Sequence, residues 1–281
     1  MKTKSELAAE QAAYWNGPGG DGWLAAYDQR IKRAIGDIGA VGLSAAAAQA
    51  GEHVVDIGCG TGDTTAALAR AVGLTGHVLG VDISGTLIEA ARSHRLDNAT
   101  FVVGDAATHP FQAGHYDLVF SRFGVMFFAD PVAAFRNIRR ALKPQGRLVF
   151  IAWRTPQENP WGTTPVRAAQ PFLPPQQRPG PEDPGQFSFG DRARVERILR
   201  DSGFASSRIE PVDRSIWMGD TVTDVLAGAG RFGPLARAFA GAEPAAIDKA
   251  KQAIAETLKP HEGPQGVHLP GACWLVTANA S

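Results

Sequence analysis

The 281 residues can form one α/β domain with an appended cap, and a content of 44% hydrophobic and 20% charged residues is ordinary for a globular protein. The 28 basic and 28 acidic side chains cancel, so no overall charge attracts nucleic acid or an anionic membrane. Cys59 and Cys273 provide neither a disulfide framework nor a zinc ligand set, and we expect no metal site and a cytoplasmic protein.

Residues 1–50 are predicted to be mostly helical, with a glycine-rich bend at YWNGPGGDGW, residues 14–23. Their first part, MKTKSELAAEQAAYWNG, lacks the apolar stretch expected of a signal peptide, and no later segment approaches the roughly 20 apolar residues of a membrane span. Tyr14 and Trp15 adjoin the bend. Aromatic rings there suit either a hinged cover over a ligand site or a contact that staples a helix to the domain.

Residues 51–155 alternate β-branched runs with alanine-rich stretches, which is typical of parallel strands joined by crossover helices. Ser84 is a predicted N-cap and Pro131 a predicted first-turn proline. The expected strands are 53–58, 77–82, 99–105, 116–122 and 147–153, and the expected helices are 63–72, 84–94 and 131–142.

The remaining residues divide into a proline-rich excursion and a C-terminal region that completes the sheet. The excursion, residues 156–190, is predicted to be irregular, with at most one short helix around residues 166–170. Residues 191–281 are predicted to contain a helix at 191–203, strands at 209–218 and 272–278, and a helical insertion at 221–258. The excursion and the insertion could close a ligand pocket or pack on a second copy of the chain, as in a homodimer.

The segment VVDIGCGTGDTT predicts a ligand site, because a strand runs through glycines directly into a helix. Gly58 and Gly60 let a ligand approach the main chain. Asp56, at the strand end, would repel a pyrophosphate but suits a cationic ligand. Asp63 occupies the position of the third glycine in G-x-G-x-x-G, which argues against an NAD-dependent oxidoreductase.

Two further acidic segments end the next strands at the same edge of the sheet. Asp82 closes VLGVD and is placed to accept both hydroxyls of a ribose. Gly104–Ala106, the GDA segment, ends the third strand, and a Gly-Asp pair there taken alone is more often just a turn. Open α/β sheets bind their ligands at this edge, so the three segments predict one site.

The glycine segment, Asp82 and GDA resemble the first three motifs of class I S-adenosylmethionine-dependent methyltransferases. Residues 120–150, FSRFGVMFFADPVAAFRNIRRALKPQGRLVF, resemble the stretch that follows in the type 11 group, which includes ubiquinone and menaquinone C-methyltransferases. The resemblance implies a Rossmann-like, doubly wound, seven-stranded and mostly parallel sheet with an antiparallel last strand, a helical N-terminal cover and helical insertions. The implied cofactor is S-adenosylmethionine, which leaves as S-adenosylhomocysteine.

The resemblance also implies which residues hold the cofactor. Ile83 and Ala106 would lie against the two faces of the adenine ring, Asp105 would accept from its amino group, and main-chain atoms near Ser121 would contact the methionine part. The full implied set is Asp56, Gly58, Gly60, Thr61, Asp82, Ile83, Gly104, Asp105, Ala106, Ser121 and Arg122.

The acceptor of the methyl group is predicted to be a small, apolar or aromatic molecule. Phe123 and Met126 continue an apolar stretch beyond the fourth strand, and Trp153 ends the fifth, although such stretches also pack helices onto sheets. No basic stripe, zinc motif or recognition module accompanies the core, so a nucleic-acid partner is not expected. Whether oxygen, nitrogen or carbon is methylated is not encoded in these features.

A general base is optional, because alignment and exclusion of water are the main tasks in methyl transfer. His109 and His268 are candidates through their position in the chain, but the sequence supplies no orienting partner for either. Arg122 could bind an acceptor carboxylate or phenolate, or form a structural ion pair. The absence of an identifiable base leaves a non-catalytic S-adenosylmethionine sensor or scaffold as the alternative function.

Overall fold

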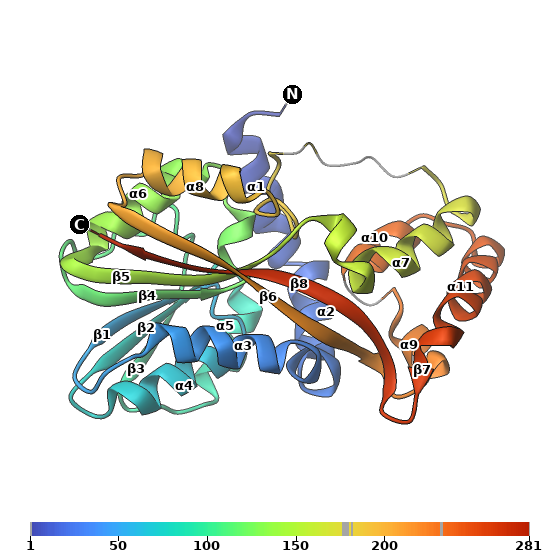
Figure 1. Cartoon of the computed structure of the whole chain (residues 1–281), viewed down its shortest axis with the longest axis horizontal. Helices are drawn as coiled ribbons and strands as arrows, with labels where there is room; N and C mark the ends of the chain where they lie inside the picture. Colours follow the sequence, from blue (N-terminus) through green and yellow to red (C-terminus); the bar gives the residue numbers. More distant parts are fainter. Residues whose placement is uncertain (1, 176–179, 181, 231–232, 281) are drawn as a thin grey trace.

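The computed structural model describes residues 2–175, 180, 182–230 and 233–280, which form a mixed α/β structure around one sheet (Figure 1). The strand order is β3-β2-β1-β4-β5-β8-β6, in which β8 alone runs in the opposite direction to the other strands, and a two-residue strand, β7, pairs with β8. This confirms the predicted fold. The strands are β1 (His53–Ile57), β2 (His77–Asp82), β3 (Ala99–Val103), β4 (Tyr116–Arg122), β5 (Leu142–Trp153), β6 (Ser206–Gly219), β7 (Glu262–Gly263) and β8 (Gly266–Asn279).

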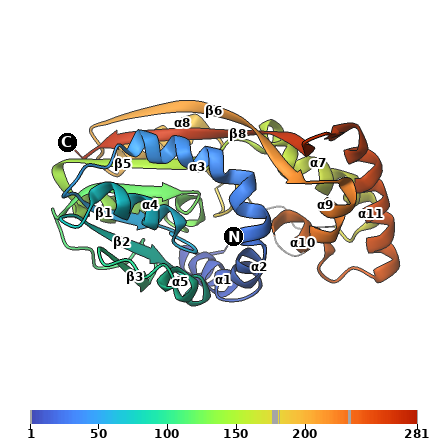
Figure 2. The same cartoon turned by 90° about the horizontal axis from the view of Figure 1, so that it is seen from below.

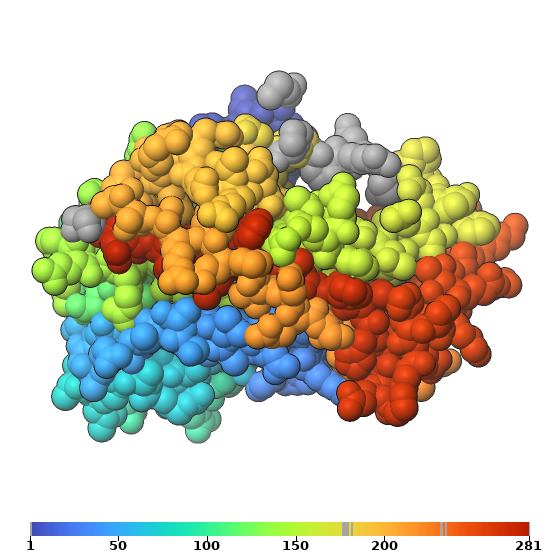
Figure 3. Space-filling model, in the orientation of Figure 1, coloured from blue at the N-terminus to red at the C-terminus, as the bar shows by residue number. Residues whose placement is uncertain are grey.

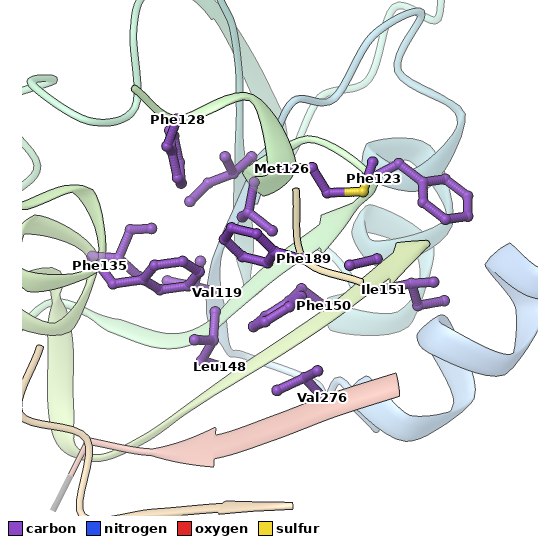
Figure 4. Close-up of a cluster of buried hydrophobic side chains, with 14 of the residues drawn as sticks. Val119, Phe123, Met126, Phe128, Phe135, Leu148, Phe150, Ile151, Phe189 and Val276 are labelled. Carbon is purple, nitrogen blue, oxygen red and sulfur yellow. The ribbon is translucent and has the colours of Figure 1, made fainter. Parts of the chain in front are cut away.

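Helices cover both faces of the sheet, which is why its central strands are apolar throughout. Helices α3 (Lys32–Ala46) and α4 (Asp63–Val72) lie on one face, and α6 (Pro131–Ala141) and α8 (Arg192–Asp201) lie on the other (Figure 1). Helix α5 (Gly85–Arg92) packs against β2 and β3. Figure 4 shows the core between α6 and the sheet, where Phe135, Phe150 and Phe189 are fully buried.

The bounds of β2, β4 and α4 agree with the sequence prediction, whereas β5, β6 and β8 are longer than predicted. Residues 273–279 of β8 pair with both β5 and β6, but residues 268–272 pair with β6 alone. The β6–β8 pair therefore continues beyond the sheet as a two-stranded arm (Figure 1). Pairing between distant segments sets this length, and local sequence patterns do not report it.

A helical lobe gathers at the end of this arm (Figures 1 and 3). It contains α7 (Pro160–Ala169), α9 (Val222–Gly228), α10 (Gly233–Phe239) and α11 (Pro244–Leu258), with short 3-10 turns at Pro156–Glu158, Gln170–Phe172 and Lys259–His261. The predicted helix at residues 166–170 is shorter than α7. Prolines were taken to break a helix here, but Pro160 occupies the first turn, where proline is tolerated. Within the described residues, no helix is both long and apolar enough to cross a membrane.

The N-terminal segment forms α1 (Lys4–Trp15), α2 (Pro18–Ala26) and a π-helical turn, Tyr27–Ile31, before α3. The predicted bend of ten residues is reduced to Asn16 and Gly17, and the glycines after it are helical. A Cβ on Gly19 would lie 2.3 Å from the Tyr14 ring, so this glycine allows α2 to pack closely on α1 rather than to swing. Figure 2 shows α1 and α2 beside α5, at the edge of the sheet where the parallel strands end.

Candidate active site

The glycine segment after β1 lies at the carboxyl edge of the sheet, and its main chain adopts conformations that favour glycine. Gly58 and Gly60 have φ angles of +65° and +54°. A Cβ on Gly58 would lie 2.7 Å from Cα of Gly124, so the turn after β4 packs directly against this loop. In front of Gly60, the only atom within 4 Å of such a Cβ among those described is Trp23 Nε1, at 3.8 Å. Gly60 is therefore only lightly packed on this side, and it lines the cavity at this edge of the sheet.

We expect Gly58→Ala to lower the free energy of unfolding by about 2 to 4 kcal/mol, because the new methyl group meets main chain and φ is positive. Gly114 is the control: its φ is +61°, and a Cβ there meets nothing within 4 Å. Gly114→Ala should thus lose only the conformational part, about 1 kcal/mol. Urea unfolding of both variants measures the difference, and equal losses would contradict the close contact with Gly124.

Asp82 joins the glycine segment to the start of α5. Its Oδ2 accepts a hydrogen bond from the Gly60 amide at 2.8 Å, and its Oδ1 accepts from the Ser84 amide at 2.9 Å. Burial raises the pKa of this carboxyl. A carboxylate has about four acceptor sites, so two remain for ligand hydroxyls. Ser84 Oγ accepts from the Leu87 amide at 3.4 Å, as expected of the predicted N-cap.

Asp56 is fully buried under the glycine segment and is not among the described residues that line the cavity. Its Oδ2 accepts hydrogen bonds from the hydroxyls of Thr64 and Thr65, both at 2.7 Å. Its Oδ1 has no hydrogen-bond partner within the described part of the chain. Burial raises the pKa of Asp56 to about 6, against the threonine bonds and the charge of Arg122, which lower it.

A cavity of about 640 Å³ opens at this edge of the sheet. Gly60, Asp82 and Asp105 line one end, and Asp105 also holds its own turn by accepting from the Ala107 amide at 2.8 Å. Most of the predicted cofactor residues meet here: Gly58, Gly60, Thr61, Asp82, Ile83, Gly104, Asp105, Ala106 and Arg122.

Ser121 lies behind the cavity wall rather than on it. Its hydroxyl donates to the Ile57 carbonyl at 2.8 Å and accepts from the Gly124 amide at 3.2 Å. The side chain therefore fixes the end of β4 against the end of β1. Ser121 is fully buried, so its predicted contact with the methionine part stays a prediction that concerns main-chain atoms.

Arg122 extends from the end of β4 toward the N-terminal helices. Its guanidinium donates to the Tyr27 hydroxyl at 3.0 Å, and both residues line the cavity. No ion pair to Arg122 occurs among the residues that the structure describes. A guanidinium without a carboxylate partner in an apolar cavity favours a ligand with an oxygen-rich or anionic group.

Tyr27 lines the cavity and was missed as a site residue by the sequence analysis, and its hydroxyl also reaches Asp63 at the start of α4. Burial acts to raise the pKa of Asp63, but hydrogen bonds from Lys32 and then Tyr27 outweigh it and lower the pKa. The Lys32 ammonium lies 2.8 Å from Asp63 Oδ1. Tyr27 thus connects the cavity to the first turn of α4. The π-helical turn that begins at Tyr27 is visible only in the structure, and it marks this residue because such turns often occur at functional sites.

An aromatic wall lines the cavity beyond the carboxyl ends of β4 and β5. Phe123 stacks on Trp153 with ring centroids 4.5 Å apart and an interplanar angle of 6°, and Trp161 lies 4.6 Å from Trp153. All three residues line the cavity. Phe123 holds this position with a φ of +66°, a strained conformation that is concentrated at functional sites. Met126 supports the wall, because its sulfur accepts from the Trp153 amide at 3.3 Å.

The cover residues Tyr14 and Trp15 line the cavity from α1. Trp15 makes edge contacts with Phe127 of the 3-10 turn Val125–Phe127 at 5.1 Å and with Trp23 of α2 at 6.1 Å. Neither His109 nor His268 is among the described residues that line the cavity. Burial lowers the pKa of His109, whose ring packs edge-on against Phe111.

These features fit S-adenosylmethionine, which is cationic and lacks phosphate. The lightly packed side of Gly60 suits a ligand that lies on main chain, and Asp82 retains acceptor sites for a ribose. The unpartnered Asp56 Oδ1 leaves a buried negative charge to be balanced. A pyrophosphate on this loop would be repelled by the Asp82 carboxylate that lines the cavity and by the Asp56 carboxylate buried behind it, so the residues present fit a phosphate poorly.

Comparison with known proteins agrees with this assignment. Residues 54–146 match the methyltransferase domain family. Demethylmenaquinone methyltransferase of Staphylococcus saprophyticus is 29% identical over 177 residues, which cover 57% of this chain and 73% of that protein. A ubiquinone/menaquinone biosynthesis C-methyltransferase of Pseudomonas aeruginosa is 37% identical over 116 residues, covering 40% of this chain and 45% of the relative.

Solved structures share the fold across nearly the whole chain. Geranyl diphosphate C-methyltransferase from Streptomyces coelicolor, in complex with Mg²⁺, geranyl diphosphate and S-adenosylhomocysteine, has a TM-score of 0.55 and 19% identity and covers 98% of each chain. A putative methyltransferase from Bacillus halodurans has a TM-score of 0.58 and 16% identity, covering 87% of this chain and 99% of that one.

Fold, site and family together define a class I S-adenosylmethionine-dependent methyltransferase. Within this class, the relatives to which the chain is similar are demethylmenaquinone and ubiquinone/menaquinone C-methyltransferases. The sequence matches concentrate on the cofactor domain, residues 54–146.

Proposed function

We propose that this protein transfers a methyl group from S-adenosylmethionine to a small apolar or aromatic molecule bound against the aromatic wall. The observation that carries the proposal is the wall itself: Phe123, Trp153 and Trp161 line the same cavity as the cofactor residues. Stacked rings with few polar neighbours bind planar or apolar ligands. The quinone methyltransferases among the relatives are consistent with an acceptor of this kind.

The wall is also close enough to the glycine segment for one cavity to hold the cofactor and the acceptor side by side. Gly124, the residue after Phe123, packs on Gly58, so the wall directly adjoins the glycine segment. When bound, S-adenosylmethionine supplies a methyl group activated by its sulfonium charge. The role of the wall is then to hold the acceptor in line and to exclude water, and orientation of this kind provides a large part of catalysis.

The polar groups on the acceptor side are few. Arg122 and the Tyr27 hydroxyl form one hydrogen-bonded pair in the cavity, and we assign them to an oxygen substituent of a bound ligand. The histidines His109 and His268 lie elsewhere and gain no role as a base from this geometry. Arg122 therefore remains the strongest of the predicted catalytic candidates.

The direct test is turnover with a panel of acceptors. Purified protein is incubated with S-adenosylmethionine and phenols, hydroquinones or indoles, with aliphatic amines as the non-aromatic set. Formation of S-adenosylhomocysteine and of a product 14 mass units heavier is measured by mass spectrometry. Methylation of at least one apolar or aromatic acceptor is the expected result. Methylation of the aliphatic amines alone would overturn the proposed acceptor class.

The wall predicts a separation between acceptor and cofactor binding. We expect Phe123→Leu to raise the acceptor KM about tenfold, since stacking contributes roughly 0.5 to 1.5 kcal/mol beyond burial, and to leave S-adenosylmethionine affinity unchanged. Phe135→Leu is the matched control, because Phe135 is a fully buried core ring that does not line the cavity. An equal effect of both substitutions on KM would show that Phe123 acts only through the core.

A further inference from the structure

The loop before α8 brings one side-chain amide to the aromatic wall. Gln186 lines the cavity together with Trp161 and Gly162, which both belong to α7. A Cβ on Gly162 would lie 3.6 Å from Gln186 Nε2, so this nitrogen lies beside the residue that follows Trp161. Gln186 is therefore a polar group at the edge of a wall that is otherwise built from aromatic rings.

The amide nitrogen of Gln186 lacks a hydrogen-bond partner. Its Nε2 atom is buried and, within the described part of the chain, neither side-chain nor main-chain oxygen accepts from it. A side-chain amide has two N–H donors, and a buried donor that is unpaired loses its hydration without compensation. The amide thus lowers the stability of the free protein. A ligand oxygen placed beside it would supply the missing partner.

The loop that carries Gln186 is fixed to the turn beneath the wall. The Gly185 amide donates to the Met126 carbonyl at 3.1 Å, and the Ser188 hydroxyl donates to the same carbonyl at 2.6 Å. The sulfur of Met126 in turn accepts from the Trp153 amide. Gln186 is held between α7 and the wall support, so little conformational freedom remains to be lost when a ligand binds.

We propose that Gln186 is a specificity-determining residue that donates a hydrogen bond from Nε2 to an oxygen atom of the methyl acceptor. The inference rests on the proposed function, in that the acceptor binds against the aromatic wall. It narrows the acceptor class to apolar or aromatic molecules that carry a carbonyl, ether or similar oxygen. A site with a buried donor rejects an analogue that lacks this oxygen, because the donor then stays unpaired.

The test compares two probes that differ by one carbonyl oxygen and requires no turnover. Indane and 1-indanone share a fused ring system, and calorimetry measures the dissociation constant of each with S-adenosylhomocysteine present at saturation. The ratio of the two constants removes the contribution of the common rings, and comparison of this ratio between protein variants isolates the contact with the oxygen.

The variant Gln186→Met keeps the length of the side chain and removes both N–H donors. We expect it to reduce the preference for 1-indanone about tenfold, through weaker binding of 1-indanone. Its melting temperature should be unchanged or higher, since an unpaired buried donor has been removed. A residue with a purely structural role would instead lose stability and leave the ratio of the two constants unchanged.

A second variant, Gln186→Glu, replaces the donor by a group that only accepts. At about pH 8 the carboxylate is ionised and repels the carbonyl oxygen of 1-indanone. The preference for 1-indanone should fall at least as far as in Gln186→Met. A preference that stays at the wild-type value in Gln186→Glu would show that the amide oxygen, or no part of Gln186, faces the ligand, and the inference would be wrong.

Gln49→Met is the matched control. Gln49 Nε2 donates to the Ala47 carbonyl at 2.7 Å, and Gln49 is not among the described residues that line the cavity. This variant should leave the ratio of the two constants unchanged. An equal ratio in wild type and Gln186→Met, or a change that comes from indane alone, would overturn the inference and leave the proposed function intact. If neither probe binds to wild-type protein that does bind S-adenosylhomocysteine, the proposed acceptor class fails as well.

Discussion

Replacing Asp82 by alanine should weaken S-adenosylmethionine binding at least tenfold, about 1.4 kcal/mol, as measured by calorimetry. The carboxylate lines the cavity, and its two remaining acceptor sites are the ones predicted to hold the ribose hydroxyls. The substitution also releases the Gly60 and Ser84 amides, so the shape of the glycine segment changes with the charge. Both effects weaken cofactor binding, and a tenfold loss is the lower bound.

A loss of stability alone would mimic this result, so the control is another hydrogen-bonded carboxylate of the sheet that lies outside the cavity. Asp117 accepts from the His53 amide at 2.9 Å and pairs with the Lys143 ammonium at 2.6 Å, and it does not line the cavity. Asp117→Ala should lower the melting temperature and leave the affinity unchanged. If the two substitutions weaken binding equally, Asp82 has no specific role in the site.

The cofactor half of the site could be predicted because its residues are close together in the sequence. Gly58, Gly60 and Asp82 are fixed by local geometry: a strand ends, the chain turns with positive φ, and the next parallel strand ends beside it. A resemblance in three successive motifs then sets the register. The structure places these residues around one cavity, as the motifs predict.

The sequence singled out Phe123, Met126 and Trp153 on the acceptor side, but their contacts could not be predicted, because these contacts join segments far apart in the chain. Arg122 meets Tyr27 across 95 positions, and Trp153 meets Phe123 only through the pairing of β4 with β5. Local patterns contain no information on such pairs.

The glycines near Trp23 illustrate a different failure. Their composition predicts a bend, and host–guest propensities agree, since glycine is less favourable than alanine in a helix by about 1 kcal/mol. In the structure they lie within α2. A Cβ on Gly20 would lie 2.2 Å from the Trp15 carbonyl oxygen, so only glycine allows α2 to pack this closely on the end of α1. Tertiary contact outweighs propensity here, and the result is a close-packed cover rather than a flexible hinge.

The second large effect is expected from Asp56→Asn, which should make the protein more stable at neutral pH while weakening S-adenosylmethionine binding. Burial raises the pKa of Asp56 from 3.8 to about 6, so above pH 6 the folded protein keeps an ionised carboxylate that the unfolded chain hydrates better. This difference corresponds to a cost on the order of 3 kcal/mol. The asparagine amide would lack a partner, at about 1 kcal/mol, which leaves a net gain of about 2 kcal/mol.

The pH dependence distinguishes this cause from a general change in packing. Below the unfolded pKa of 3.8 both states are protonated, and the stabilising effect of the raised pKa is fully present. As the pH rises toward 6, the unfolded chain ionises first and the stability of the wild type falls. Asparagine does not titrate, so the melting temperatures of variant and wild type should converge toward pH 4 and separate by several degrees at pH 7.5.

A buried charge that lowers stability is retained where function needs it, and the cationic cofactor gives that need. Calorimetry at pH 7.5 should therefore show weaker S-adenosylmethionine binding in the variant that melts at the higher temperature. If Asp56→Asn melts below the wild type at pH 7.5, the carboxylate is already compensated in the free protein, with Arg122 as the nearby cation. If the variant is more stable and binds S-adenosylmethionine equally well, Asp56 shapes the loop through Thr64 and Thr65 and its charge plays no part in binding.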